Sequence, residues 1–116
     1  MKSIEIISIP VTDQERAKEF YLNLGFEIIT EAPMGKDKWI QMALPGNAVS
    51  VTLVNWFPKM SAGSFQGMVV LTDSIDKDRQ ELKLKGIEVG VTDETPWGKF
   101  ANIVDPDGNG LTLREE

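Results

Sequence analysis

Hydrophobic residues near the start of the chain change from a strand-like to a helix-like spacing. Residues 4–11 read Ile-Glu-Ile-Ile-Ser-Ile-Pro-Val, and such β-branched side chains favour a pleated strand. Thr12-Asp13 follows as a capping signal, and Gly25 stands where a left-handed C-terminal cap is expected. Between them, one apolar helix face is formed by Ala17, Phe20, Tyr21 and Leu24. The pattern therefore predicts a strand followed by a helix.

Three further apolar runs, separated by turn residues, continue the first half of the chain. They predict strands at residues 26–29, 39–44 and 49–54. The first run is followed by a loop containing Pro33 and Gly35, and the last two are separated by a Pro-Gly-Asn turn. The predicted order is β-α-β-β-β.

The same order recurs at an offset of about 60 residues, which is the sequence sign of a duplicated structural unit. Residues 8–13 align with 68–73, and Leu-Gly-Phe at 24–26 corresponds to Lys-Gly-Ile at 85–87. Residues 55–63, which contain Pro, Ser and Gly, read as a connection. We predict a single domain over residues 1–116, with module one at 1–54, a linker at 55–63 and module two at 64–116.

Composition and charge exclude several classes of function. The net charge is −6 and no basic cluster is present, so nucleic acid is not an expected partner. No apolar run approaches the length of a membrane helix, and the first residues do not resemble a signal peptide, so we expect a cytoplasmic protein that does not enter membranes. Cysteine and histidine are both absent. Their absence removes the commonest general base and the commonest ligands of transition metals.

Four short segments resemble the vicinal oxygen chelate superfamily, which includes glyoxalases, bleomycin-resistance proteins and extradiol dioxygenases. These segments are Ile9–Asp13 with Arg16–Tyr21, Leu24-Gly25-Phe26, Pro96-Trp97-Gly98, and Asp105-Pro106-Asp107-Gly108-Asn109. The resemblance covers essentially the whole chain. It implies an α+β fold of two tandem βαβββ modules, which form a curved mixed sheet around a cleft with the helices on the outer face. By residue type alone, Asp105–Asn109 is a turn.

Metal-dependent members of this superfamily place ligands at cleft-facing strand positions, and the resemblance carries these positions over to this chain. The four slots are Ile6, Ser50, Gln66 and Thr112. Ile6 and Gln66 lie seven residues before Asp13 and Asp73, respectively. Thr112 follows the Asp-Pro-Asp-Gly-Asn turn, and Ser50 is its counterpart in the repeat.

The residue types in these slots do not favour metal binding. None is anionic, and the side chain of Ile6 cannot coordinate a metal. We therefore predict neither a metal nor a cofactor. Glu5 is the alternative ligand if the strand register is shifted by one residue.

Aromatic residues and neutral amides are the candidate ligand contacts. Gln66 and Asn102 either orient a ligand or satisfy a neighbouring strand. Flat aromatic surfaces suit a planar or hydrophobic molecule, and the chain has three tryptophans, Trp39, Trp56 and Trp97. Core or interface packing is the alternative role for each tryptophan.

Three functions remain open at this point. The leading one is a metal-free binding protein, similar to the bleomycin-resistance branch, which holds a small aromatic or hydrophobic molecule in its cleft. The alternative is a metal-dependent lyase, isomerase or dioxygenase in which a shifted carboxylate acts as base or ligand. A regulatory module without a small-molecule ligand is the third. The resemblance also implies a homodimer.

Overall fold

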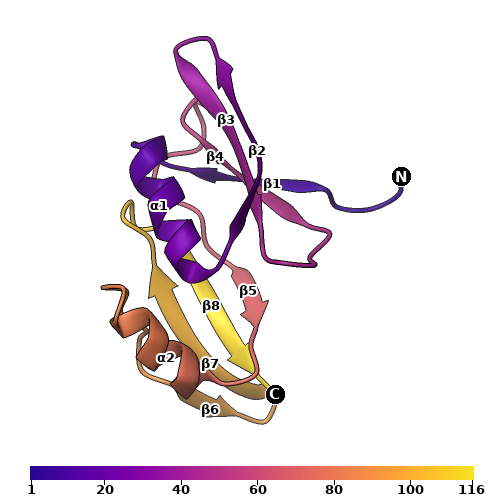
Figure 1. Cartoon of the computed structure of the whole chain (residues 1–116). Helices are drawn as coiled ribbons and strands as arrows, with labels where there is room; N and C mark the ends of the chain where they lie inside the picture. The colour runs from indigo at the N-terminus through magenta and orange to yellow at the C-terminus, as the bar shows by residue number, and fades with distance from the viewer.

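The chain follows the β-α-β-β-β order twice (Figure 1). The computed structural model describes residues 1–116. Module one contains β1 (Ile6–Pro10), α1 (Gln14–Leu24), β2 (Glu27–Met34), β3 (Asp37–Ala43) and β4 (Ser50–Val54). Module two contains β5 (Met68–Leu71), α2 (Ile75–Lys83), β6 (Asp93–Thr95), β7 (Gly98–Val104) and β8 (Gly110–Glu115). The predicted α+β class and its two βαβββ modules are confirmed.

The strands form two four-stranded mixed sheets, one in each module, where the sequence predicted one curved sheet. Sheet A has the order β1-β4-β3-β2, and sheet B has the order β5-β8-β7-β6. In each sheet the first strand of the module pairs in parallel with the last, and the remaining pairs are antiparallel. As a result, β1 and β5 are both edge strands.

Local sequence signals account for the bounds of the helices. The Asp13 carboxylate accepts a hydrogen bond from the Arg16 backbone N–H at 3.1 Å, and Gly25 ends α1 with a φ of 109°. Ser74 caps α2 in the same way, by accepting from the Lys77 backbone N–H at 3.1 Å. Neither helix is long and apolar enough to cross a membrane.

Strand β2 is longer than the sequence predicts. It runs to Met34, so Pro33 lies within the strand and not in the loop that we expected for it. Proline is tolerated here because β2 is an edge strand and its missing N–H removes no ladder bond on the free side. A register shift between Ile28 and Thr30 accompanies the extension.

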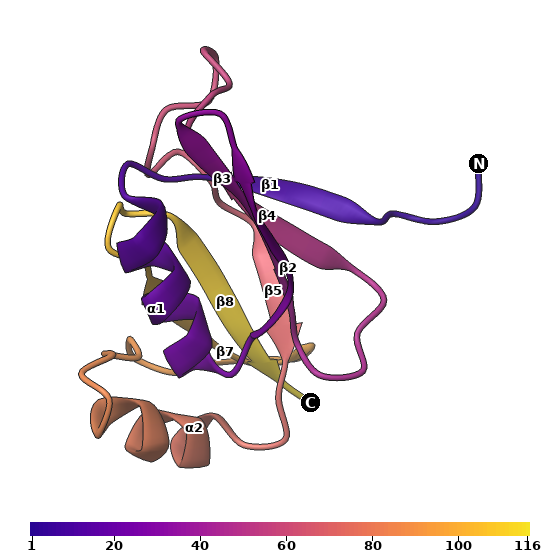
Figure 2. The same ribbon diagram turned by 45° about the horizontal axis from the view of Figure 1, so that its top comes forward.

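Both helices lie on the same side of the two sheets (Figure 2). A core of 17 buried residues draws on both modules. The N-terminal residues before β1 extend away from this body, and the side chain of Ile4 is 68% exposed.

The Asp105–Asn109 turn connects the two modules as well as reversing the chain between β7 and β8. The buried Asp105 carboxylate accepts from the Tyr21 hydroxyl at 2.9 Å and from the Asn109 side-chain amide at 2.8 Å. Asn109 also donates to the Pro10 carbonyl at 2.7 Å, and Asp107 accepts from the Thr12 hydroxyl at 2.6 Å. Burial, followed by the neighbouring charge of Asp105, raises the pKa of Tyr21 well above its usual value. Tyr21 is thus a core residue with one buried polar contact.

Candidate functional site

Each sheet has one face that packs against the helices and one face that no helix covers, which we call the open face. On sheet B the helix side holds the core residues of β7 and β8, including Ala101, Ile103, Leu111 and Leu113. Because side chains alternate along a strand, the residues between them point to the other side. The open face of sheet B is therefore formed by Val69, Leu71, Phe100, Asn102, Val104, Thr112 and Arg114.

The side chains of this open face lie in rows across the sheet. One row places Leu71, Arg114 and Phe100 side by side, and the next places Val69, Thr112 and Asn102 side by side. Val69, Leu71 and Val104 are 55%, 60% and 60% exposed, respectively. Apolar residues thus surround a polar centre on a surface that this chain leaves open to solvent.

Two neutral amides contribute to this polar centre. The Thr112 hydroxyl donates to the side-chain oxygen of Asn102 at 2.8 Å, which leaves the Asn102 amide N–H groups without a partner in the chain. The side chain of Gln66 lies where a Cβ on Gly110 would stand, since its Oε1 would be only 2.3 Å from that atom. Gln66 therefore covers a glycine at the end of the same face.

Arg114 is held in place by the turn between β6 and β7. Its Nε and Nη2 donate to the Trp97 carbonyl at 3.0 and 2.6 Å. Gly98, with a φ of 125°, lets this turn approach the backbone of β8, because a Cβ there would stand only 2.5 Å from the Glu115 carbonyl oxygen, while its 3.5 Å distance from Arg114 Nε is ordinary contact. The Trp97 side chain itself is 74% exposed.

A line of hydrogen bonds connects the polar side chains on the open face of sheet A. Trp39 Nε1 donates to Gln41 Oε1 at 3.2 Å, and Gln41 Nε2 donates to Ser50 Oγ at 2.8 Å. Ser50 Oγ in turn donates to the Glu5 carbonyl at 3.0 Å. Beside this chain the Ser8 and Thr52 hydroxyls lie 3.1 Å apart. Each of these side chains therefore has a partner within the chain, and one N–H of Gln41 stays free.

The four metal slots offer a donor set that does not fit a divalent cation. Ile6 lies opposite Ser50 in the β1–β4 register, but it presents only an alkyl group. The hydroxyls of Ser50 and Thr112 are engaged by protein partners. No group of three or more His, Cys, Asp or Glu residues in the structure could hold a metal ion. Glu5, the alternative ligand, lies just before β1, and its bonds with Ser50 involve the backbone carbonyl and not the carboxylate.

An apolar groove adjoins the open face of sheet B. It has a volume of about 720 Å³ and separates the edge strands β1 and β5, which is within the range of small-molecule sites. Its lining includes Ile7, Val49, Val51, Phe65, Gln66, Met68, Val69 and Leu71. Because Gln66, Val69 and Leu71 belong to both, the groove and the open face form one continuous candidate site.

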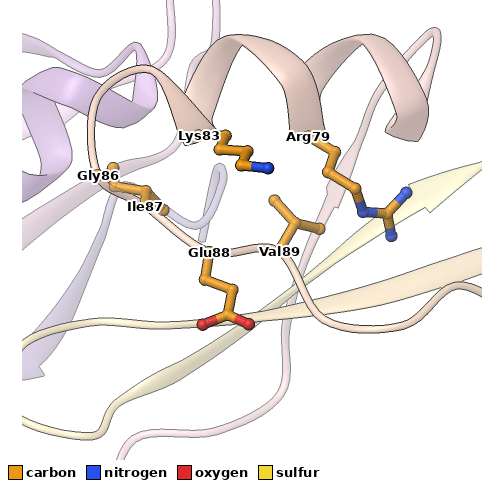
Figure 3. Close-up of a pocket in the computed structure, with 6 residues that line it drawn as sticks. All are labelled: Arg79, Lys83, Gly86, Ile87, Glu88 and Val89. Carbon is orange, nitrogen blue, oxygen red and sulfur yellow. The ribbon is translucent and has the colours of Figure 1, made fainter.

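A second hollow, of about 420 Å³, lies beside α2 (Figure 3). Arg79 and Lys83 extend from the helix on the side of Val89, whereas Glu88 points the other way. Arg79 is already bound to Asp76, and its Nη2 donates to the Gly90 carbonyl at 2.7 Å. Because Arg79 is already bonded to other groups of the protein, we interpret this hollow as a surface depression and not as a ligand site.

The structure places the candidate residues from the sequence analysis in three regions. Gln66, Asn102 and Trp97 belong to sheet B and its turns, whereas Trp39 belongs to sheet A. Trp56 lies in the linker and is 6.4 Å from Phe57 between ring centroids. Sequence reasoning did not nominate Arg114 or Gln41. Arg114 is two residues from Thr112, so the alternation of a strand places both on one face.

Comparison with known proteins defines the class. The model of the Glyoxalase/Bleomycin resistance protein/Dioxygenase superfamily matches residues 3–113. The chain therefore belongs to this superfamily.

Individual relatives agree with this assignment. TnmS3, an antibiotic binding protein from Streptomyces sp. CB03234, is 39% identical with a TM-score of 0.93, over 99% of this chain and 96% of that chain. A glyoxalase/bleomycin resistance protein from the same Streptomyces strain is 40% identical with a TM-score of 0.86, over 97% and 100% of the two chains. YetH of Bacillus subtilis (strain 168) is 31% identical over 99% of both chains.

Proposed function

We propose that this protein binds a small planar or hydrophobic molecule without a metal. The observation that carries the proposal is the open face of sheet B, where exposed Val69, Leu71 and Val104 surround a polar pair, Asn102 and Thr112. Contiguous exposed apolar surface with a few fixed polar groups is typical of a ligand site. The likeness to TnmS3, described as an antibiotic binding protein, supports the same function.

The absence of suitable ligands in the metal slots supports a binder over an enzyme. Reversible binding needs shape and hydrogen bonds but no acid, base or metal. Tyr21 is unsuited to proton transfer because it is buried in the core, bonded to Asp105, and its pKa is raised. Ser50, one of the four slots, accepts a hydrogen bond from Gln41.

We further propose that two copies associate, so that the ligand is held in a cleft formed between the open face and the partner. Thirteen large hydrophobic residues are exposed in the single chain, among them Ile28 and Ile29 of edge strand β2. Exposed apolar surface on this scale favours a partner. The cytoplasmic location and the lack of affinity for nucleic acid stay predictions.

Titration with a planar probe tests this function. The three tryptophans provide the signal, and 2-methylanthraquinone is an uncharged probe of suitable shape. We expect saturable quenching with one probe per chain, and the same dissociation constant in EDTA as with added zinc or manganese. Failure to saturate, or binding only when a metal is present, would contradict the proposal and favour the metal-dependent enzyme.

A further inference from the structure

We propose that Arg114 selects ligands that carry an anionic oxygen group on an aromatic ring. This inference rests on the proposed binding function and names the chemistry of its ligand. The three arginines differ in whether a carboxylate is paired with them. Arg16 is paired with Asp107 and Arg79 with Asp76, whereas no carboxylate lies within ion-pair distance of Arg114. In a chain with a net charge of −6, an arginine without a carboxylate partner is unexpected.

Arg114 lies on the open face and keeps free donors there. Only two of its five N–H groups are used, and both go to the Trp97 carbonyl. This contact holds the guanidinium beside Gly98, since Arg114 Nε lies 3.5 Å from where a Cβ on Gly98 would stand. A guanidinium that is already ordered loses little further freedom when it binds an anion. The three remaining N–H groups can meet a carboxylate or phenolate oxygen.

The neighbours of Arg114 indicate an aromatic ligand. In its row it lies between Leu71 and Phe100, which supply apolar contact on both sides. Asn102 lies two residues along β7 from Phe100, or about 7 Å away along the strand. Its free amide N–H groups are donors as well. The polar part of this face therefore consists of donors, and it is complementary to a ring that carries acceptor oxygens.

The charges and hydrogen bonds around this site place the recognition on sheet B. Asp93 is the one carboxylate in the row of Arg114, and Phe100 separates the two. On sheet A the equivalent polar groups form the chain from Trp39 to Ser50, which leaves one free N–H, on Gln41, against two on Asn102 and three on Arg114.

A matched pair of probes tests the inference. Anthraquinone-2-carboxylate and 2-methylanthraquinone differ in the charged group, and both are titrated against the full-length protein and Arg114→Met by tryptophan fluorescence. We expect the carboxylate to bind the unmodified protein at least roughly tenfold more tightly, and Arg114→Met to lose this preference while its affinity for the methyl probe changes by less than about threefold. Arg16→Met removes the same charge from α1 and should keep the preference.

Each other outcome overturns the inference in a distinguishable way. If both probes bind the unmodified protein equally, or if Arg114→Met keeps the preference, the function stands and the role of Arg114 is wrong. If neither probe binds, the proposed function fails together with the inference. If Arg114→Met loses both probes and also sediments as a smaller species than the unmodified protein, then Arg114 is a subunit contact and not a ligand contact.

Discussion

Tyr21 shows how one residue serves both the core and the junction between the modules. Its ring packs edge-on against Phe20 and Phe26, with centroids 5.3 and 5.5 Å away, while its hydroxyl bonds Asp105 of module two. An aromatic ring supplies apolar area, and its hydroxyl must find a partner once buried. The apolar pattern of the helix predicted the first role but not the second.

Removing this hydroxyl should therefore weaken the fold. We expect Tyr21→Phe to lower the free energy of unfolding by about 2 kcal/mol, since a hydrogen bond to a charged group is lost and Asp105 stays buried. Asp105→Asn should cost more, because its new amide N–H groups would face the donors that the carboxylate now accepts from. Urea denaturation measures both variants. An unchanged midpoint for both would contradict the role of this junction.

Gly98 is a second residue at which the surrounding backbone leaves no space for a side chain. We expect Gly98→Ala to be destabilising by about 1–3 kcal/mol beyond the cost of a positive φ, because the Cβ would stand 2.5 Å from the Glu115 carbonyl. Gly25→Ala is the matched control, since Gly25 also has a positive φ but no atom within 4 Å of the added Cβ. Thermal unfolding of the two variants separates strain from contact. Equal losses of stability in the two variants would show that the contact with the Glu115 carbonyl does not restrict Gly98.

At the scale of elements, four charged side chains join α1 to the β2–β3 hairpin. Glu15 and Lys18 of α1 interact with Glu31 of β2 and Lys38 of β3, at distances between 2.6 and 3.3 Å. Hydrogen bonds from Lys38 and then Lys18 lower the pKa of Glu15 to about 2, and the bond from Lys18 lowers that of Glu31. The cluster thus favours the ionised carboxylates in the folded state.

This cluster predicts a loss of stability in acid. A carboxylate whose pKa is lower in the folded state stabilises the protein above its unfolded value of 4.5, and that contribution is lost as the pH falls toward 2. Because the groups are partly exposed, we expect a contribution of only about 0.5–1 kcal/mol, and less at high salt. Urea denaturation at pH 5 and pH 3 measures it. Lys38→Met should flatten the difference, and an identical pH dependence in that variant would rule out this origin.

The sequence predicted the elements better than the side-chain arrangement of the site. Spacing and capping residues located α1 and its Gly25 cap, because these signals act within one turn of helix. The position of Gln66 depends instead on Gly67, whose φ of 95° interrupts the alternation before β5. The contact of Arg114 with Trp97 depends on how the β6–β7 turn approaches β8. Such contacts between separate strands leave no mark in the local pattern.

In the whole molecule, the two sheets differ in how many hydrogen-bond donors on their open faces have no partner. The polar side chains on the open face of sheet A are bonded to one another and leave one free N–H, whereas sheet B has free donors on Asn102 and Arg114 among exposed apolar residues. The modules share one topology but do not share one surface chemistry. We therefore place the polar recognition of the ligand on module two and expect module one to contribute mainly apolar and aromatic area.

The extended N-terminal residues give a prediction about assembly. Ile4 precedes β1, is 68% exposed, and has no strand beside it in this chain (Figure 2). If it is buried by a second copy, Ile4→Ser should weaken the dimer by roughly tenfold or more, because burial of such a side chain is worth about 1.5–3 kcal/mol. Leu84→Ser, a change at a residue that is 90% exposed at the end of α2, should have no effect. Sedimentation at micromolar concentration measures both, and a strictly monomeric unmodified protein would refute the dimer.

Nuclear magnetic resonance can show whether a ligand binds the open face of sheet B without a metal. Spectra of ¹⁵N-labelled protein are recorded in EDTA during titration with 2-methylanthraquinone. We expect the largest shifts at the Asn102 side-chain amide, the Trp97 indole and the backbone of β5 and β8. An absence of shifts without metal, or shifts confined to the α2 hollow around Arg79 and Lys83, would contradict this prediction.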